Sequence, residues 1–273
     1  MAAVLVAVSL AVPSPAKEVL VGIASSFAFA TTALLLQTFH RHVIDTARRD
    51  FFGDELLDAG PTFAYPDFEL APEVKDLLQG HNSQLLYAKP VRHFAQTVHR
   101  VDLPRAAASN DMEALVHLAS LFDASTARPM SIRTDYDVVR HCDCSFLSVG
   151  LSSNDCTHLY LTTADVPLFA IVDDDAGSEF IRLYDGSEFR STPERQVGVI
   201  LRYAPEPHDV PSRRWFLVAG LGPLGTIGAA WFITHCWRRL HSDAGPRDFV
   251  AVISIPSATE RRVRFEALLQ EPT

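Results

Sequence analysis

The most hydrophobic part of the chain lies near its beginning. No charged residue occurs from Val19 to Leu36, and the apolar character continues to Phe39. At about 1.5 Å per residue, roughly 20 apolar residues form a helix long enough to cross the hydrocarbon core of a bilayer. We therefore predict a transmembrane helix over residues 18–39. A buried helix of a folded domain is the alternative.

Charged residues on either side of this segment predict its orientation. The basic or titratable residues after the segment are His40, Arg41, His42, Arg48 and Arg49, whereas Lys17 is the one basic residue before it. By the positive-inside rule, everything after residue 40 then lies in the cytoplasm. Residues 2–12 form a second apolar run that is too short to span a bilayer, and we interpret it as a partial first span. The predicted location is the cell membrane, with a cytoplasmic C-terminal domain.

Beyond residue 95, short apolar runs alternate with helical patterns. Strand-like runs are predicted over eight segments: 97–102, 130–134, 144–149, 167–172, 180–184, 197–203, 214–219 and 249–255. The paired runs around residues 173–177 and 185–186 are predicted to form an antiparallel hairpin. A helix is predicted over residues 112–122, where Leu115, Leu118 and Phe122 share one face. Such alternation is typical of a largely parallel sheet that is covered by helices. We predict a doubly wound, Rossmann-like α/β domain over residues 95–273.

Between these two parts, residues 41–94 are rich in Gly, Pro, Asp and Phe from residue 50 onward. Such residues mark turns and irregular chain. A short helix is predicted over residues 72–79, ending at Gly80. We expect residues 41–94 to be a linker or a capping layer, and residues 1–40 to be a membrane segment.

Charge and cysteine content narrow the functional classes. The net charge is −9, from 24 Lys and Arg against 33 Asp and Glu. A general nucleic-acid binder needs a basic surface to contact phosphates, so nucleic acid is excluded as a partner. Four cysteines in 273 residues do not form a disulfide framework and suit a reducing compartment.

Two loops with glycine follow predicted strands and lead into predicted helices. One runs from Gly150 to Thr157, and the other is the G-x-G-x-x-G turn from Gly220 to Gly225. Glycines let the backbone approach a phosphate, and a helix N-terminus favours negative charge. In doubly wound sheets, ligands bind beyond the carboxyl ends of strands. The candidate ligand-binding residues are Gly150, Ser152, Ser153, Asn154, Asp155, Thr157, Gly220, Gly222, Gly225 and Thr226.

Both loops also have structural interpretations. Ser153, Asn154 or Asp155 can cap a helix, and the G-x-G-x-x-G glycines can serve close packing of a strand against a helix. The turn lies in the last quarter of the chain, and the strand after it ends in Ser254-Ile255-Pro256 without an acidic residue. An ordinary NAD-dependent dehydrogenase is therefore excluded. The sequence does not identify a cofactor.

Other residues offer weaker candidate chemistry. Five residues near one another in sequence have side chains that can bind a metal: His141, Cys142, Cys144, Cys156 and His158. The paired C-x-x-C units of zinc ribbons are absent, so no metal site is predicted. Cys156 lies at a possible helix start, where a thiolate can be stabilised. Residues 173–175, three aspartates, are interpreted as a turn before Gly177, with divalent-ion binding as the alternative.

Two stretches carry a resemblance to known proteins: residues 145–157, Ser-Phe-Leu-Ser-Val-Gly-Leu-Ser-Ser-Asn-Asp-Cys-Thr, and residues 215–231. Over about residues 95–270 the chain resembles an uncharacterised group of bacterial proteins. More loosely, it resembles the Rossmann-like nucleotide-sensing modules of the SLOG and TIR-like type, which bacterial defence systems attach to membrane helices. This resemblance implies that the domain binds, or cleaves, a nucleotide-derived signal. The catalytic glutamate of TIR-like enzymes has no matching position here.

The sequence thus predicts a membrane-anchored protein whose cytoplasmic domain binds a nucleotide-derived or other phosphorylated ligand. The predicted role is in signalling or defence, and a homo-oligomer is compatible with it. One alternative is a hydrolase that acts on a nucleotide or nucleoside, with Asp155, Cys156 or Glu194 taking part. Another is a structural membrane protein without a ligand, in which the glycines serve packing alone.

Overall fold

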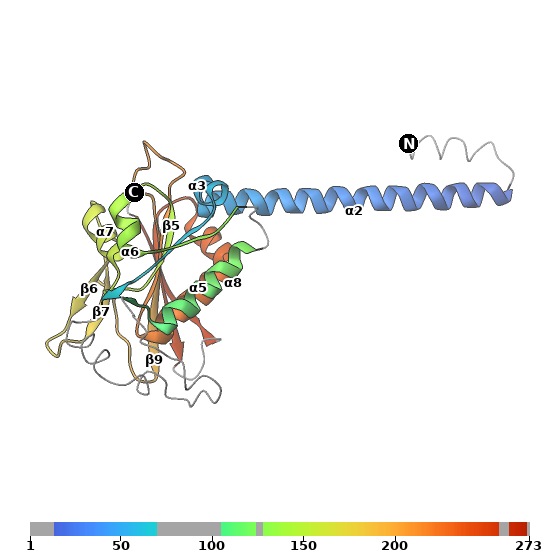
Figure 1. Cartoon of the computed structure of the whole chain (residues 1–273). Helices are drawn as coiled ribbons and strands as arrows, with labels where there is room; N and C mark the ends of the chain where they lie inside the picture. Colours follow the sequence, from blue (N-terminus) through green and yellow to red (C-terminus); the bar gives the residue numbers. More distant parts are fainter. Residues whose placement is uncertain (1–13, 70–104, 124–127, 257–261, 272–273) are drawn as a thin grey trace, which may run out of the picture. The chain divides into compact units, whose positions relative to one another are not determined.

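The computed structural model describes residues 14–69, 105–123, 128–256 and 262–271 (Figure 1). The chain forms two compact units, residues 1–50 and 51–273. In the first unit the structure describes most of one long helix, α2 (Ser14–Phe52). The second unit is an α/β domain, and it includes the last two residues of α2. The predicted partial span over residues 2–12 and the predicted helix over residues 72–79 lie outside the described residues.

A seven-stranded sheet forms the centre of the second unit, in the order β12-β11-β9-β10-β5-β1-β4. The strands are β1 (Thr62–Tyr65), β4 (Ser131–Thr134), β5 (Phe146–Val149), β9 (Arg195–Tyr203), β10 (Trp215–Leu221), β11 (Phe249–Pro256) and β12 (Arg264–Gln270). The pairs among β10, β5, β1 and β4 are parallel, whereas the pairs that involve β9 or β12 are antiparallel. The α/β class is confirmed, but the sheet is mixed rather than mostly parallel.

Alternation along β10 shows why both faces of this sheet are covered. Successive side chains of a strand point to opposite faces, and every residue from Trp215 to Ala219 is buried. Trp215 stacks on Phe146 and contacts Tyr203 on one face, whereas Phe216 contacts Phe51 and Phe52 on the other. A strand that is apolar on both faces needs a layer on each side.

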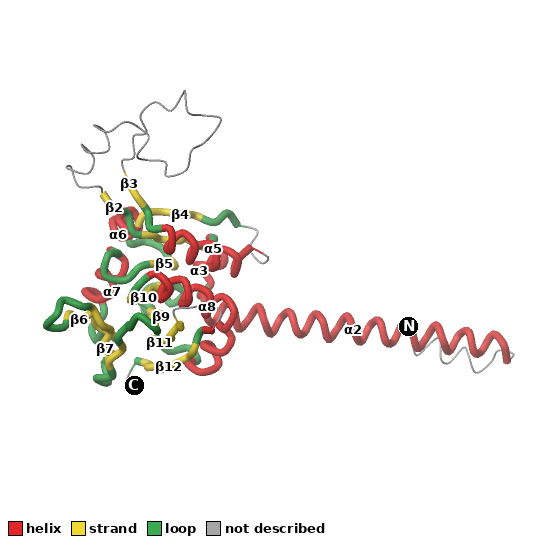
Figure 2. The backbone as a smooth tube through the Cα atoms, turned by 90° about the horizontal axis from the view of Figure 1, so that it is seen from below, coloured by secondary structure: helices red, strands yellow, loops and turns green. Residues whose placement is uncertain are grey.

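Helices supply those two layers (Figures 1 and 2). α5 (Ser109–Asp123) and α8 (Pro223–Ala244) pack against each other on one face, and α8 also lies along β9, β10 and β11. α6 (Asp135–His141) and α7 (Asp155–Thr163) lie on the other face, where Tyr160 of α7 joins the core beneath β10. The predicted helix over residues 112–122 is confirmed as α5.

Beside α7 lies a smaller antiparallel sheet of β6 (Phe169–Asp173), β7 (Glu179–Leu183) and β8 (Glu188–Phe189). The predicted hairpin is confirmed as the pair of β6 and β7. It forms its own three-stranded sheet and packs on the face of the large sheet through Phe169, Ile181 and Leu183. A further short pair, β2 (Phe68–Glu69) with β3 (Arg105–Ala106), completes the described strands.

The described part of the predicted linker or capping region, residues 41–94, contributes to the second unit from Phe51 onward, whereas residue 95 lies outside the described residues. Phe51, Phe52 and Leu56 of the predicted linker are fully buried, and Leu56 lies in α3 (Asp54–Ala59). β1 lies between β4 and β5, inside the large sheet. Its run Thr-Phe-Ala-Tyr is too short to show a strand period, so only its long-range partners identify it as a strand.

The first unit shows no helix that is long and apolar enough to cross a membrane among the residues that the structure describes. The side chains of residues 14–21 and 24, which include the start of the predicted span 18–39, lie outside those residues. In the described part of α2, eight large hydrophobic side chains are exposed: Ile23, Phe27, Phe29, Leu34, Leu35, Leu36, Phe39 and Val43.

Candidate functional site

The two glycine-bearing loops leave the sheet at the same edge. β5 and β10 are parallel neighbours, so their carboxyl ends lie side by side. The chain then enters α7 on one face of the sheet and α8 on the other (Figure 1). Adjacent parallel strands whose helices go to opposite faces form a topological switch point, which is the usual ligand position in open α/β sheets.

Asn154, predicted as a ligand residue, is instead the N-cap of α7. Its side chain is fully buried, and its Oδ1 accepts hydrogen bonds from the Cys156 amide at 2.7 Å and from the Ser148 hydroxyl at 3.1 Å. Its Nδ2 donates to the Val149 carbonyl at 2.5 Å. Thr157 is also fully buried and donates to the Gly150 carbonyl. These polar groups hold the loop together from inside.

A carboxylate accepts a hydrogen bond from another backbone amide at the start of α7. The Asp155 amide donates to Asp135 Oδ2 at 2.9 Å. Asp135 Oδ1 also accepts from the amides of Tyr136 at 2.9 Å and Asp67 at 3.3 Å. This single buried side chain therefore joins the ends of β1, β4 and β5. Burial raises the pKa of Asp135, while the hydrogen bonds from the three backbone amides counteract that rise.

What remains open in this loop is its rim. Ser153 and Asp155 are exposed, and Ser152 is half-buried. The Ser152 hydroxyl donates to Glu179 Oε2 at 2.9 Å, and His158 Nε2 lies 2.7 Å from the Ser152 carbonyl oxygen. Gly150 needs its glycine because its φ is +102° and a Cβ there would lie 3.2 Å from Pro66. Of the predicted residues in this loop, only Ser152, Ser153 and Asp155 thus have side chains that reach solvent.

The G-x-G-x-x-G turn brings α8 unusually close to the sheet. A Cβ on Gly220 would lie 2.3 Å from the Gly225 carbonyl carbon, and a Cβ on Gly225 would lie 2.3 Å from the Val197 oxygen. Gly198 on β9 faces the same point, since its Cβ would lie 2.5 Å from the Gly225 oxygen. Thr226 is buried in the same contact. Close packing of helix against sheet therefore accounts for these glycines.

Gln196 closes the N-terminus of α8. Its Oε1 accepts from the amides of Leu224 at 2.8 Å and Gly225 at 3.3 Å, while Pro223 has no amide to donate. Gly222 has φ +100°, and a Cβ there would lie 2.7 Å from the same Oε1. The carboxamide of Gln196 thus occupies the position at which a phosphate would meet the helix.

The alternative nucleophile is unsuited to catalysis in this fold. Cys156 is fully buried, and burial raises the pKa of its thiol to about 12. The thiolate is the reactive form, so Cys156 is unreactive near neutral pH. Asp155 and Glu194, named with it as candidates, are both exposed.

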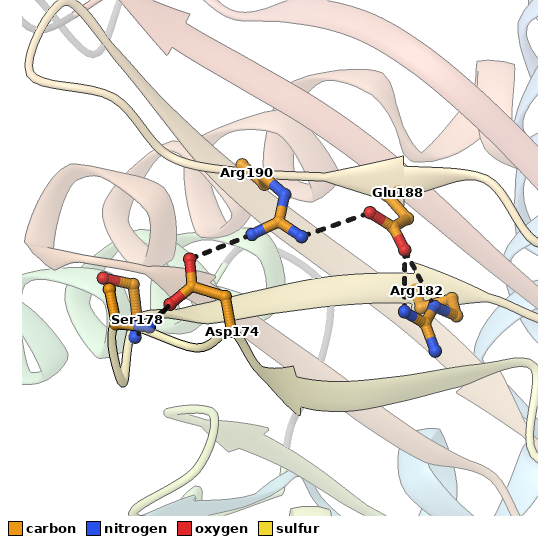
Figure 3. A network of polar contacts seen from close by, with 6 residues as sticks. Asp174, Ser178, Arg182, Glu188 and Arg190 are labelled. Carbon is orange, nitrogen blue, oxygen red and sulfur yellow. Dashed lines mark hydrogen bonds and ion pairs between the residues drawn. The ribbon is translucent and has the colours of Figure 1, made fainter.

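Of the three aspartates at residues 173–175, Asp173 ends β6, whereas Asp174 and Asp175 lie in the turn between β6 and β7. Asp174 Oδ1 accepts from the amides of Ala176 and Ser178, and its Oδ2 pairs with Arg190 at 3.1 Å (Figure 3). Arg190 also pairs with Glu188, which binds Arg182. The hydrogen bond from the Ser178 backbone amide lowers the pKa of Asp174. Within the described residues, no group of His, Cys, Asp or Glu is arranged to hold a metal ion.

Sequence patterns did not reveal which backbone amides Gln196 and Asp135 bind at this edge. Gln196 lies 28 residues before its partner amide of Leu224, and Asp135 lies 20 residues before its partner amide of Asp155. A helix start that lacks its own capping residue was the available signal for Gln196, because Gly222 has no side chain to cap α8. Comparisons with protein-family models, curated proteins and solved structures found no match to this chain.

Proposed function

We propose that this chain is a membrane-anchored α/β protein, held at the bilayer by the N-terminal part of α2 and with its second unit in the cytoplasm. The observation that carries the proposal is the distribution of exposed apolar side chains around α2. At about 100° per residue, Ile23, Phe29 and Leu35 point in three directions roughly 120° apart. Their exposed fractions are 53, 78 and 65%.

This all-round distribution distinguishes lipid from the other surroundings of a helix. A helix that lies flat on a bilayer, or that pairs with one partner, shows one apolar stripe and one polar face. A helix that is apolar all round is surrounded by apolar material. The apolar segment is also free of charge until His40 and Arg41, in agreement with the positive-inside rule.

The polar side chains within the segment support the same proposal. The hydroxyls of Thr31, Thr32 and Thr38 donate to the carbonyls of Phe27, Ala28 and Leu34, at 2.8 to 2.9 Å. A hydroxyl without a partner is costly in hydrocarbon. These threonines satisfy their donors within the helix, so they need no partner from outside it.

Paired charge substitutions test the anchor. Phe29→Lys with Leu35→Lys places two charges in the segment, each opposing insertion by about 3 kcal/mol. Val116→Lys with Ile132→Lys is the matched control, because these side chains are 70% and 59% exposed in the second unit. We expect the wild-type protein and the Val116→Lys/Ile132→Lys control to remain in the membrane fraction after a carbonate wash. The Phe29→Lys/Leu35→Lys variant should be absent from that fraction. Wild type in the supernatant, or a first variant that stays in the membrane, would contradict the proposal.

Orientation needs a separate measurement, because insertion alone does not show which side the second unit occupies. A C-terminal alkaline phosphatase fusion should be inactive, and a green fluorescent protein fusion at the same position should be fluorescent. The reverse pattern would place the second unit outside the cytoplasm while leaving the anchor itself intact.

A second candidate function is binding of a nucleotide-derived ligand, which the switch point between β5 and β10 favours. Because Gln196, Asp135 and Asn154 occupy the helix N-termini, the ligand would meet the rim residues Ser152, Ser153 and Asp155. Tryptophan-monitored melting with a nucleotide panel tests this, since ligand at 100 times its Kd adds about 2.7 kcal/mol. A shift that Ser153→Ala abolishes and Ser187→Ala preserves supports the site. No shift with any nucleotide counts against it.

A signalling or defence role, and the hydrolase alternative, rest on the sequence resemblance and on Asp155 or Glu194. Product formation from NAD or nucleoside phosphates, lost in Asp155→Ala with unchanged melting, would favour a hydrolase over simple binding.

A further inference from the structure

Arg202 on β9 is an unusual residue to find at the centre of an apolar layer. Its side chain is fully buried, and it lies on the face of the sheet that α8 covers. Burial lowers the pKa of Arg202 to about 10, so the guanidinium stays charged at neutral pH. A buried charge is tolerated only where other groups compensate for its lost hydration.

One compensating contact joins Arg202 to the end of α8. Its Nη2 donates to the carbonyl of Gly245 at 2.6 Å and to the carbonyl of Arg247. Gly245 follows the last residue of α8, and its amide donates back to His241 at 2.8 Å. Carbonyls at a helix C-terminus carry partial negative charge and favour a cation. Arg202 therefore holds the chain where α8 ends.

The other compensating groups are the negative charge of Asp248, which favours the charged form of Arg202, and two aromatic rings. The guanidinium carbon lies 5.2 Å from the centre of the Phe51 ring and 5.0 Å from that of Phe249. Among the described residues, Nε and Nη1 of Arg202 have no hydrogen-bond partner. Ring faces attract a cation most strongly where water is excluded. The compensation for this charge thus depends in part on rings that keep water away from it.

Phe51 is the residue through which α2 contributes to this arrangement. It lies in the last turn of α2, directly after the boundary between the two units. Its ring also contacts Trp237 at 5.9 Å and His241 at 6.1 Å, both on the last turns of α8. The chain leaves the helix at once, because Gly53 has φ +82° and a Cβ there would lie 2.2 Å from the Ser212 oxygen.

We propose that the last turn of α2 is a conformational coupling element, which holds the C-terminal end of α8 in place through Phe51 and Arg202. When Phe51 is displaced, water reaches the guanidinium, and its hold on the Gly245 and Arg247 carbonyls weakens. α8 begins at the Gly220 to Gly225 turn, so one helix connects this coupling element with the candidate site. The coupling concerns contacts inside the second unit and holds whether or not α2 lies in a membrane.

Neighbouring phenylalanines make a matched pair of variants. Phe51→Leu removes the ring over Arg202, whereas Phe52→Leu removes a ring that packs against Phe122, Phe216 and Trp237 at 5.3 to 5.7 Å. Both rings are fully buried, so both variants lose similar packing. Amide hydrogen exchange of the full chain in detergent micelles is measured for residues 241–247 and, as an internal reference, for β10.

We expect Phe51→Leu to accelerate exchange at residues 241–247 about fivefold relative to β10, and Phe52→Leu by less than about twofold. Arg202→Met should reproduce the acceleration, and Phe51→Leu should then add nothing to it. Equal acceleration by the two leucine variants would show packing loss without coupling. So would a further acceleration by Phe51→Leu in the Arg202→Met background. If Arg202→Met does not fold, Arg202→Lys takes its place in the same comparison.

Discussion

Gly220→Ala probes the closest contact between helix and sheet in this protein. The new Cβ would lie 2.3 Å from the Gly225 carbonyl carbon and 2.5 Å from the Thr226 amide nitrogen. Ordinary carbon contacts need about 3.5 Å, so α8 would have to move away from β10 by about 1 Å. These neighbours are backbone atoms at the start of a 22-residue helix, and they cannot rotate out of the way.

The expected cost follows from this geometry. Overpacking of a rigid core costs about 1–3 kcal/mol, and a backbone clash belongs at the upper end of that range. For a unit of this size, about 3 kcal/mol lowers the melting temperature by roughly 6–12 °C. Trp215, Trp231 and Trp237 all lie in the second unit, so tryptophan fluorescence reports its unfolding in detergent micelles.

Gly177→Ala is the control for a glycine without close neighbours. Gly177 has φ +75° but open space around its Cα, so alanine there costs backbone strain alone, about 1–2 kcal/mol. If Gly220→Ala melts no lower than Gly177→Ala, the packing account of the G-x-G-x-x-G turn is refuted. A phosphate-binding turn would instead lose a ligand at unchanged stability.

Three further outcomes follow from the same contacts. Gln196→Leu should cost about 1–2 kcal/mol in urea unfolding, because the Leu224 and Gly225 amides lose their acceptor; an unchanged midpoint would contradict the cap. Alkylation at pH 8 followed by peptide mass spectrometry should leave Cys156 unmodified while Cys142, which is half-buried, reacts; rapid modification of Cys156 in the folded chain would overturn its assignment as a buried thiol. Burial raises the pKa of Asp111 from 3.8 to about 6, so the folded state binds the proton more tightly and stability falls as pH rises from about 4 to 6. Asp111→Asn should therefore melt higher than wild type at pH 7, with the difference shrinking towards pH 4, and a pH-independent difference would argue against this titration.

Local patterns predicted the elements whose residues form a continuous apolar run or share one apolar face. The runs over residues 197–203, 214–219 and 249–255 became β9, β10 and β11, since apolar residues in a short run favour a strand that is buried on both faces. α5 followed from its apolar face and the polar residues before it. The turn at residues 173–177 followed from Asp and Gly, because those residues stabilise turns through their own side chain and backbone.

Long-range contacts decided what no local period could reveal. β1 is four residues long and is separated in the chain from both of its partners, yet it pairs with β4 and β5 inside the sheet. The predicted linker that contains it therefore belongs to the second unit. Strand direction was decided in the same way, because the period of a strand is identical in parallel and antiparallel pairs.

The candidate site shows the same division. Local sequence showed that two glycine loops follow apolar runs, and that an uncharged apolar segment precedes a basic one. The packing of distant segments brings Gln196 and Asp135 to the helix starts, because a hydrogen-bond partner must be close in space and not in sequence. The same packing places Phe51, in the last turn of α2, in the aromatic core around Arg202, where its ring lies over the buried guanidinium.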